Sequence, residues 1–195
     1  MPAHSIITDP NIHEPKGAAA ASAGQVYVSD GSGSGTWITD PSGWGLYQDD
    51  SAEQTFNTTP ALLTIDTLGS LTEENYLPLA IRGSTSLWTA GAVSPISVGD
   101  AYSIRLDLPI TARATAVYTT LSLDIGGAAT PTMEIVKKRI EVNRTAPFDL
   151  STTLNVFSLA TFVANGGQFF LTTDSGSIGI TAPKIFIQRT HSEVT

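Results

Sequence analysis

The three histidines are the first residues to consider for chemistry, because imidazole moves protons and binds metals near neutral pH. His4, His13 and His191 all lie near an end of the chain, outside every segment that the sequence predicts as a strand. A catalytic triad or a histidine metal site needs side chains that a rigid scaffold holds in position. The histidines therefore indicate neither, and the sequence predicts no metal ligands.

Carboxylates stand side by side at Asp49-Asp50 and at Glu73-Glu74. A glycosidase needs two carboxyl groups on opposite sides of a sugar, whereas neighbours along a strand point to opposite faces. No calcium loop with alternating oxygen ligands is recognisable, and the glycine-rich residues 31–35 lack the lysine and the helix of a phosphate-binding loop. We interpret the acidic pairs as solvated residues and expect a protein that is not an enzyme and binds no cofactor. A polysaccharide-active enzyme with an acid pair that the sequence does not reveal remains an alternative.

Aromatic side chains can stack on sugar rings, as in a receptor-binding lectin. The candidates are Trp37, Trp44, Trp88 and the five tyrosines. Aromatic residues make up only 8% of the chain, and Trp44 and Trp88 flank predicted strands, where core packing or a subunit contact is commoner. Packing is therefore the favoured interpretation, and recognition of host surface glycans is the alternative.

Four of the ten positive charges lie between Lys137 and Arg144. These residues fit a solvated strand face. They also fit an interface in which Lys137 and Arg139 pair with the acidic residues 49–53 or 73–74 of a neighbouring subunit. Lys137 and Arg139 are therefore predicted inter-subunit contacts.

The composition excludes several classes of protein. A chain of 195 residues and 20.5 kDa has room for one principal domain, with or without an arm. Because cysteine is absent, the chain forms no disulfides and no thiolate metal sites. The net charge is −8, and residues 1–80 hold ten acidic groups against one basic group, so no nucleic-acid partner is expected. No signal peptide and no run of about 18 apolar residues is recognisable, so no membrane span is expected.

Residues 1–36 have the composition of an N-terminal arm. Their first half contains an apolar anchor at Ile6, Ile7, Pro10, Ile12 and Pro15. The Ala-, Gly- and Ser-rich residues that follow offer little to bury and so predict a flexible segment. Val26-Tyr27-Val28 is the best strand candidate within it.

From Trp37 onward, short alternating runs predict an all-β domain at residues 37–195. The clearest run is 102–110, where apolar and polar residues alternate with the period of a half-buried strand. Residues 117–125 and 134–144 repeat this pattern, and the three runs predict consecutive antiparallel strands with one solvated side.

Shorter runs complete a set of about ten predicted strands. They are residues 43–48, 54–58, 62–66, 77–82, 154–159, 168–173 and 184–189. Residues 158–164 fit a helical turn as well as a strand, and Pro78 and Pro109 are expected at sheet edges or bulges. The whole pattern predicts an antiparallel jelly-roll β-sandwich with an extended N-terminal arm.

Several stretches resemble virion proteins of tailed bacteriophages, including fibres and capsid-associated proteins. Ile12-His-Glu-Pro-Lys-Gly-Ala-Ala-Ala-Ala21, Gly24-Gln-Val-Tyr-Val-Ser-Asp-Gly31 and Gly33-Ser-Gly-Thr-Trp37 are similar to an N-terminal signature of these proteins. Residues 156–173 and 185–189 resemble their C-terminal jelly-roll domains. The resemblance implies a trimeric jelly roll, related in shape to the heads of C1q and tumour necrosis factor, that is attached to the particle through its arm.

On this basis we expect a homotrimeric capsid decoration protein, of the cement or head-fibre type, on the surface of the virion. The arm residues expected to bind the major capsid protein are Ile6, Ile7, Pro10, Ile12, His13, Pro15, Lys16, Val26, Tyr27 and Val28. The expected inter-subunit contacts are Lys137 and Arg139, together with Phe169, Phe170 and Phe186 on runs that are apolar on both faces. The alternative is a receptor-binding module of a tail or head fibre that recognises host surface glycans.

Overall fold

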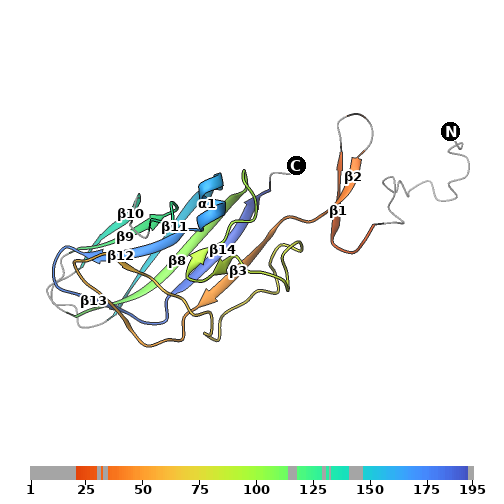
Figure 1. Ribbon diagram of the computed structural model, residues 1–195. Coiled ribbons are helices and arrows are strands. Elements are labelled where there is room, and N and C mark those ends of the chain that lie inside the picture. Colours follow the sequence, from red (N-terminus) through yellow and green to blue (C-terminus); the bar gives the residue numbers. More distant parts are fainter. Residues whose placement is uncertain are drawn as a thin grey trace, which may run out of the picture. The chain divides into compact units, whose positions relative to one another are not determined.

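The computed structural model describes residues 21–29, 32, 35–113, 118–128, 131, 133–140 and 147–192. The chain divides into two compact units, Met1–Asp40 and Pro41–Thr195, and each is described by itself (Figure 1). This division lies four residues later than the boundary at 36/37 that the composition suggested. The reason is that Trp37 belongs to a β-hairpin of the first unit, where it pairs with Tyr27.

The hairpin of the first unit consists of β1 (Gln25–Ser29) and β2 (Gly35–Thr39), which pair antiparallel. The rings of Tyr27 and Trp37 pack edge to face with their centroids 5.3 Å apart, and the Asp40 N–H donates to the Gly24 carbonyl at 3.0 Å. Gly35 is required where the chain enters β2, because a Cβ there would lie 2.2 Å from the Val28 carbonyl oxygen. The strand expected at residues 26–28 is therefore present, and it pairs with residues 36–38, across the boundary at 36/37 that the composition suggested.

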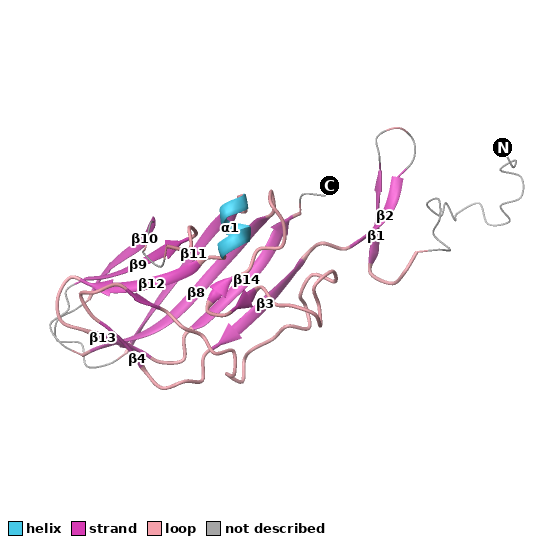
Figure 2. Ribbon diagram, viewed as in Figure 1, coloured by secondary structure: helices cyan, strands magenta, loops and turns pink. Residues whose placement is uncertain are grey.

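The regular secondary structure of the second unit is strand, apart from one short helix among the described residues, and loops connect these elements (Figure 2). Its elements are β3 (Gly43–Gln48), β4 (Gln54–Phe56), β5 (Ala61–Leu62), β6 (Trp88–Thr89), β7 (Ala92–Val93), β8 (Ala101–Ala112), β9 (Tyr118–Asp124), β10 (Met133–Arg139), β11 (Phe148–Phe157), α1 (Ala160–Asn165), β12 (Gln168–Thr173), β13 (Ile178–Ile180) and β14 (Lys184–His191).

Two antiparallel sheets make up the sandwich. One has the order β10-β9-β12-β5, and the other contains β3, β14, β8, β13, β4 and β11. One edge of β8 pairs with β11 over the whole length of β11. The other edge of β8 pairs with β14 and then with β13, which are two halves of one interrupted strand. In the same way β3 pairs with β14 and β4 pairs with β13.

The chain passes between the two sheets in the order of a jelly roll. With the interrupted strands joined, the larger sheet has the order β3/β4, β14/β13, β8, β11 and the smaller has the order β5, β12, β9, β10. Chain order runs from β3/β4 to β5, β8, β9, β10, β11, β12 and back to β13/β14, so most connections cross from one sheet to the other. The expected antiparallel jelly-roll sandwich is confirmed.

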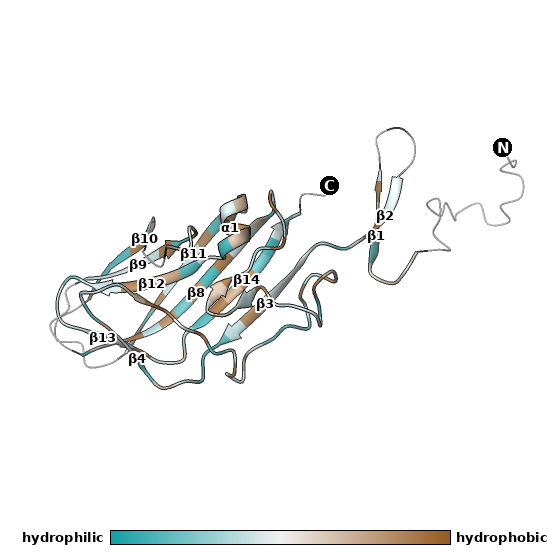
Figure 3. Ribbon diagram, viewed as in Figure 1, coloured by the Kyte–Doolittle hydropathy of each residue, from teal (hydrophilic) through white to brown (hydrophobic). Residues whose placement is uncertain are grey.

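Alternating side chains of β8 form the centre of the core. Tyr102, Ile104, Leu106, Leu108 and Ile110 are all buried, whereas the residues between them are half-buried or exposed. Figure 3 shows hydrophobic and hydrophilic positions mixed along the strands of this unit. Side chains of β9 and β12 complete this core from the opposite sheet. Each fully buried aliphatic side chain contributes about 1.5–3 kcal/mol to folding, so this layer is the main source of stability.

Two prolines occupy places that differ from the sequence expectation. Pro109 lies inside β8, but its carbonyl accepts a hydrogen bond from Thr181 N–H, in the gap between β13 and β14. Because N–H and C=O of one residue point to the same side of an antiparallel strand, the missing donor faces this interruption. Pro78 begins a turn, since Ile81 N–H and Arg82 N–H both donate to its carbonyl, so the strand predicted at 77–82 is wrong.

Candidate functional site

The predicted arm contacts fall into two sets. Ile6, Ile7, Pro10, Ile12, His13, Pro15 and Lys16 lie outside the described residues. Val26, Tyr27 and Val28 form the middle of β1. The side chains of Val26 and Val28 are 40% and 37% exposed, whereas Tyr27 packs against Trp37 on the other face of the hairpin. The hairpin therefore presents two neighbouring valines to solvent.

The hairpin also has backbone groups that can pair with another strand. Among the described residues, β1 and β2 pair only with each other, so each has one outer edge. Outer edges present N–H and C=O groups that can bind an added strand. A two-stranded ribbon has little stability of its own, so a partner that adds a strand or covers the valines would also stabilise it.

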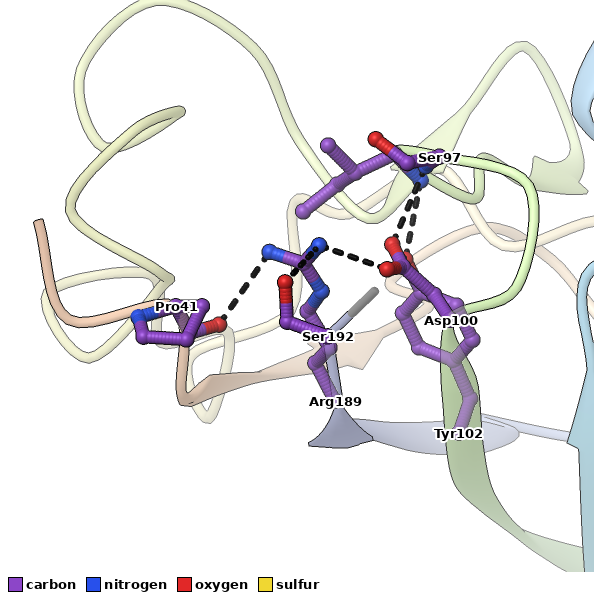
Figure 4. A network of polar contacts seen from close by, with 7 residues as sticks. Pro41, Ser97, Asp100, Tyr102, Arg189 and Ser192 are labelled. Atoms are coloured by element: carbon purple, nitrogen blue, oxygen red, sulfur yellow. Dashed lines mark hydrogen bonds and ion pairs between the residues drawn. The ribbon is translucent and has the colours of Figure 1, made fainter. Parts of the chain in front are cut away.

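At the start of the jelly roll, a buried network of polar groups holds the chain where it enters β3 (Figure 4). Arg189 Nη2 donates to Asp100 Oδ1 at 2.7 Å and to Ser192 Oγ at 2.8 Å, and Nη1 donates to the Pro41 carbonyl at 3.3 Å. The side chains of Arg189 and Asp100 are only 5% and 0% exposed. Arg189 thus links the C-terminal end of β14 to Pro41, the first residue of the second unit. We call these groups, with Tyr102, the Arg189 clamp.

The other carboxylate oxygen of Asp100 completes the clamp. Asp100 Oδ2 accepts hydrogen bonds from Ser97 N–H and from the Tyr102 hydroxyl, both at 3.0 Å, and that hydroxyl accepts one from Ile96 N–H at 2.8 Å. Burial raises the pKa of Tyr102, and the charge of Asp100 raises it further, so the phenol stays neutral and donates. The clamp is therefore a positioning device made of one charge pair and a neutral donor.

The outer face of the larger sheet bears an aromatic cluster, which we define as Trp44, Tyr76 and Phe186. Trp44 stacks on Tyr76 with 4.9 Å between ring centroids and tilts against Phe186 at 5.3 Å. The guanidinium of Arg105 lies 5.8 Å from the centroid of the Phe186 ring. Phe186 is half-buried on this outer face, where sequence reasoning expected a subunit contact.

Phe169 and Phe170 differ from Phe186. Phe169 is 0% exposed in the core between the sheets, and Phe170, on the opposite face of β12, is 6% exposed. Both faces of β12 are covered by the chain itself. The prediction that these two side chains make inter-subunit contacts is therefore wrong, because neither has surface to offer a second copy.

Lys137 and Arg139 are exposed on β10, an edge strand of the smaller sheet. The ammonium of Lys137 lies 5.2 Å from the centroid of the Tyr118 ring. Neither residue forms an ion pair within the part of the chain that the structure describes. Exposed positive charge on an edge strand discourages edge-to-edge aggregation, and it is available to an acidic partner.

One acidic residue has a structural role that sequence reasoning missed. Asp49 is buried where the β3/β4 strand is interrupted. Its Oδ1 accepts a hydrogen bond from Asp66 N–H at 2.8 Å, and its Oδ2 accepts bonds from Ser51 Oγ and from Gln54 Nε2. The interpretation of Asp49 as a solvated surface residue is therefore wrong.

Arg189 was missed as well, although the sequence contained a signal. Ile185, Ile187 and Arg189 alternate along one face of the predicted strand at 184–189, so the pattern places a charge on the buried face. Such a charge needs a partner. Asp100 could not be assigned to it from spacing, because it lies 89 positions away.

Two further features concern the described ranges of the chain. No three histidine, aspartate or glutamate side chains come together there as a metal ion would require. Over the same residues no helix has the length and apolar character of a membrane span.

No family model matches the chain, and no curated protein sequence matches it. Among solved structures, PRD1 vertex protein P5, a phage virion protein, matches with a TM-score of 0.47 and 15% identity, covering 78% of this chain and 98% of that chain. The Eiger TNF of S. frugiperda matches with a TM-score of 0.43 and 9% identity, covering 80% of this chain and 96% of that chain. Both likenesses are too distant to assign a family or a function.

Proposed function

We propose that the protein is a non-enzymatic structural component of a bacteriophage particle, namely a homotrimeric decoration protein on the capsid surface whose N-terminal unit binds the major capsid protein. The observation that supports this most is the division of the chain. Residues 24–37, which resemble a phage virion signature, belong to a hairpin unit that is distinct from the jelly roll at 41–195. Attachment and display are then functions of separate units.

The hairpin is suited to attachment in two ways. Its open strand edges can add to a sheet of the capsid protein, and the exposed Val26 and Val28 can enter an apolar groove. One such contact is small and binds weakly. Three arms on one trimer raise the effective concentration of the second and third contacts, so attachment becomes firm.

The Arg189 clamp supports the same function from the side of the jelly roll. An attachment arm transmits force to the domain that it holds, at the residue where the arm joins. The part-buried hydrogen bond from Arg189 to Pro41 ties this residue to β14, in the middle of the larger sheet. A force applied to the arm would therefore act on β14, an interior strand of the larger sheet, and not on a peripheral loop.

The trimer is supported by the surface of the jelly roll. The aromatic cluster leaves Tyr76 55% exposed beside the half-buried Trp44 and Phe186, on a face that a second copy could cover. Lys137 and Arg139 offer positive charge to the acidic residues of a neighbouring copy. Light scattering of the full chain at micromolar concentration should give three times 20.5 kDa. A monomer under these conditions contradicts the trimer and leaves attachment to be tested separately.

Attachment is tested by sedimenting capsids that lack the native protein with three forms of the chain. Full-length protein should co-sediment, and residues 41–195 alone should stay in the supernatant. The double variant Val26→Ser/Val28→Ser should co-sediment with the capsids in a smaller amount than the full-length protein does. Val98→Ser is the matched control, because Val98 is a 53%-exposed valine of the jelly roll. Undiminished co-sedimentation of residues 41–195 would mean that the jelly roll itself binds the capsid.

A further inference from the structure

A pocket of about 770 Å³ opens in the second unit, and its lining includes no residue of the clamp or of the aromatic cluster. Its walls come from residues 65–67 after β5, from Glu74, from the turn at 83–86 and from residues 88–91 of the β6–β7 hairpin. The volume lies within the range of about 300–1,000 Å³ that small-molecule sites occupy. Four separate segments thus build a recess of the size of a ligand site.

The lining is hydroxylic and acidic. Five lining residues are serine or threonine: Thr67, Ser84, Thr85, Ser86 and Thr89. Asp66 and Glu74 add carboxylates, and the lining includes no lysine or arginine. A ligand with negative charge would be repelled, whereas hydroxyl groups would find both donors and charged acceptors.

Hydrogen bonds hold the floor of the pocket in position. Trp88 Nε1 donates to the Ile65 carbonyl at 3.0 Å, and Trp88 N–H donates to Ser86 Oγ at 3.0 Å. Ser86 Oγ in turn donates to the Tyr47 hydroxyl at 3.0 Å, and Leu87 N–H donates to the same oxygen. The floor is therefore preorganised, which lowers the entropy cost of binding.

At the rim of the pocket, by contrast, some polar groups can still bind a ligand. Within the described part of the chain, the hydroxyls of Thr67, Thr85 and Thr89 have no protein partner. Asp66 Oδ1 accepts bonds from Leu68 N–H and Asp50 N–H, and these bonds lower the pKa of its carboxyl, so the group is an ionised acceptor at neutral pH.

The backbone at this pocket is also strained. Three described residues other than glycine have positive φ, and two of them line the pocket, Thr67 at 65° and Ala90 at 52°. For a β-branched residue such as threonine this conformation is an outlier that costs about 1–3 kcal/mol. Ala90 and Gly91, both with positive φ, form the two-residue turn of the β6–β7 hairpin, so only Thr67 is strained outside such a turn. Strain at a single residue outside a turn is often found at ligand sites, where a fixed side-chain position is needed.

Asp66 fits recognition of a ligand better than the role of a general acid. A glycosidase needs a general acid that stays protonated near neutral pH, through a raised pKa. The backbone donors at Asp66 have the opposite effect on its pKa. The acid pair Asp66 and Glu74 therefore suits recognition of hydroxyl groups and does not suit proton donation by Asp66.

We propose that this pocket binds one sugar unit of an uncharged glycan, with the carboxylates of Asp66 and Glu74 and the hydroxyls of Thr85 and Thr89 as the recognising groups. Trp88 and Ile65 are only 3% and 5% exposed, so they support these groups from within the core and are not themselves a stacking surface. This inference is independent of capsid attachment, because every lining residue belongs to the jelly-roll unit and none to the hairpin.

The test is saturation-transfer NMR on the full chain. The neutral ligands are the methyl glycosides of glucose, galactose, mannose and N-acetylglucosamine. The acidic counterpart is the methyl glycoside of galacturonic acid with its carboxylate free. At least one neutral glycoside should bind at millimolar concentration, and the acidic sugar should not. Thr85→Val and Glu74→Gln should each weaken binding about tenfold, as loss of one hydrogen bond to a ligand does. Glu134→Gln, an exposed acid of β10, is the matched control and should bind as the unaltered chain does.

Three results would overturn the proposal. They are failure of all four neutral glycosides to bind, preference for the acidic sugar, and unchanged affinity of both Thr85→Val and Glu74→Gln. Since Glu74 lies beside the Tyr47 hydroxyl, melting curves check that its variant is folded; Thr85 is exposed and provides the second, independent variant. Capsid co-sedimentation of the same variants should be unchanged, which separates failure of this site from failure of attachment.

Discussion

Replacing Arg189 by methionine tests whether the clamp stabilises the jelly roll. The change keeps an unbranched apolar stem but removes the guanidinium and its charge, which leaves the carboxylate of Asp100 fully buried without its counter-ion. Removing one partner of a buried pair costs about 3–5 kcal/mol, because an uncompensated charge remains. For a domain of this size each kcal/mol lowers Tm by about 2–4 °C, so Arg189→Met should lower Tm by about 6–20 °C.

The assay is thermal unfolding followed by circular dichroism and calorimetry at fixed protein concentration, since Tm of an oligomer depends on concentration. Arg105→Met is the matched control: Arg105 pairs with Asp107 in a bridge whose side chains are 53% and 23% exposed. Exposed pairs contribute about 0–1 kcal/mol, so the control should change Tm little. The double variant Arg189→Met/Asp100→Asn should regain part of the loss, because no unpaired charge is then buried. Equal effects of Arg189→Met and Arg105→Met would refute the reasoning.

Three further predictions follow from particular contacts. Burial raises the pKa of Tyr47 to about 12 and raises that of Tyr102 as well, so the folded state retains protons that the unfolded state loses above pH 10. The free energy of unfolding, measured with urea, should therefore be unaffected by these two groups below pH 10. Above pH 10 it should fall by about 1.4 kcal/mol per pH unit for each tyrosine, and Tyr47→Phe should remove about half of this slope. Gly35→Ala should disrupt the hairpin and reduce capsid binding while calorimetry shows the jelly-roll transition unchanged; a lowered jelly-roll Tm would contradict the independence of the two units. Replacing Lys137 and Arg139 by serine should leave far-UV circular dichroism unchanged and alter the salt dependence of assembly, and unfolding would instead assign them a structural role.

The sequence alone determined much of the jelly roll, because strand periodicity is a local property. The alternation at 102–110 predicted the core of β8, and the runs at 43–48 and 168–173 coincide with β3 and β12. Alternation follows from successive side chains pointing to opposite faces, so it is visible without knowledge of the partner strand. The class of fold could be predicted for the same reason.

The tertiary structure decided which faces are covered and which distant groups meet. Phe169 and Phe170 had the same sequence pattern as Phe186, yet the chain buries the first two and leaves the third at the surface. The ion pair of Arg189 with Asp100 joins residues 89 positions apart, and the pocket draws on four segments between residues 65 and 91. These juxtapositions depend on sheet order and on loop paths, which are set by the free energy of the whole packed chain and not by the pattern of any one strand.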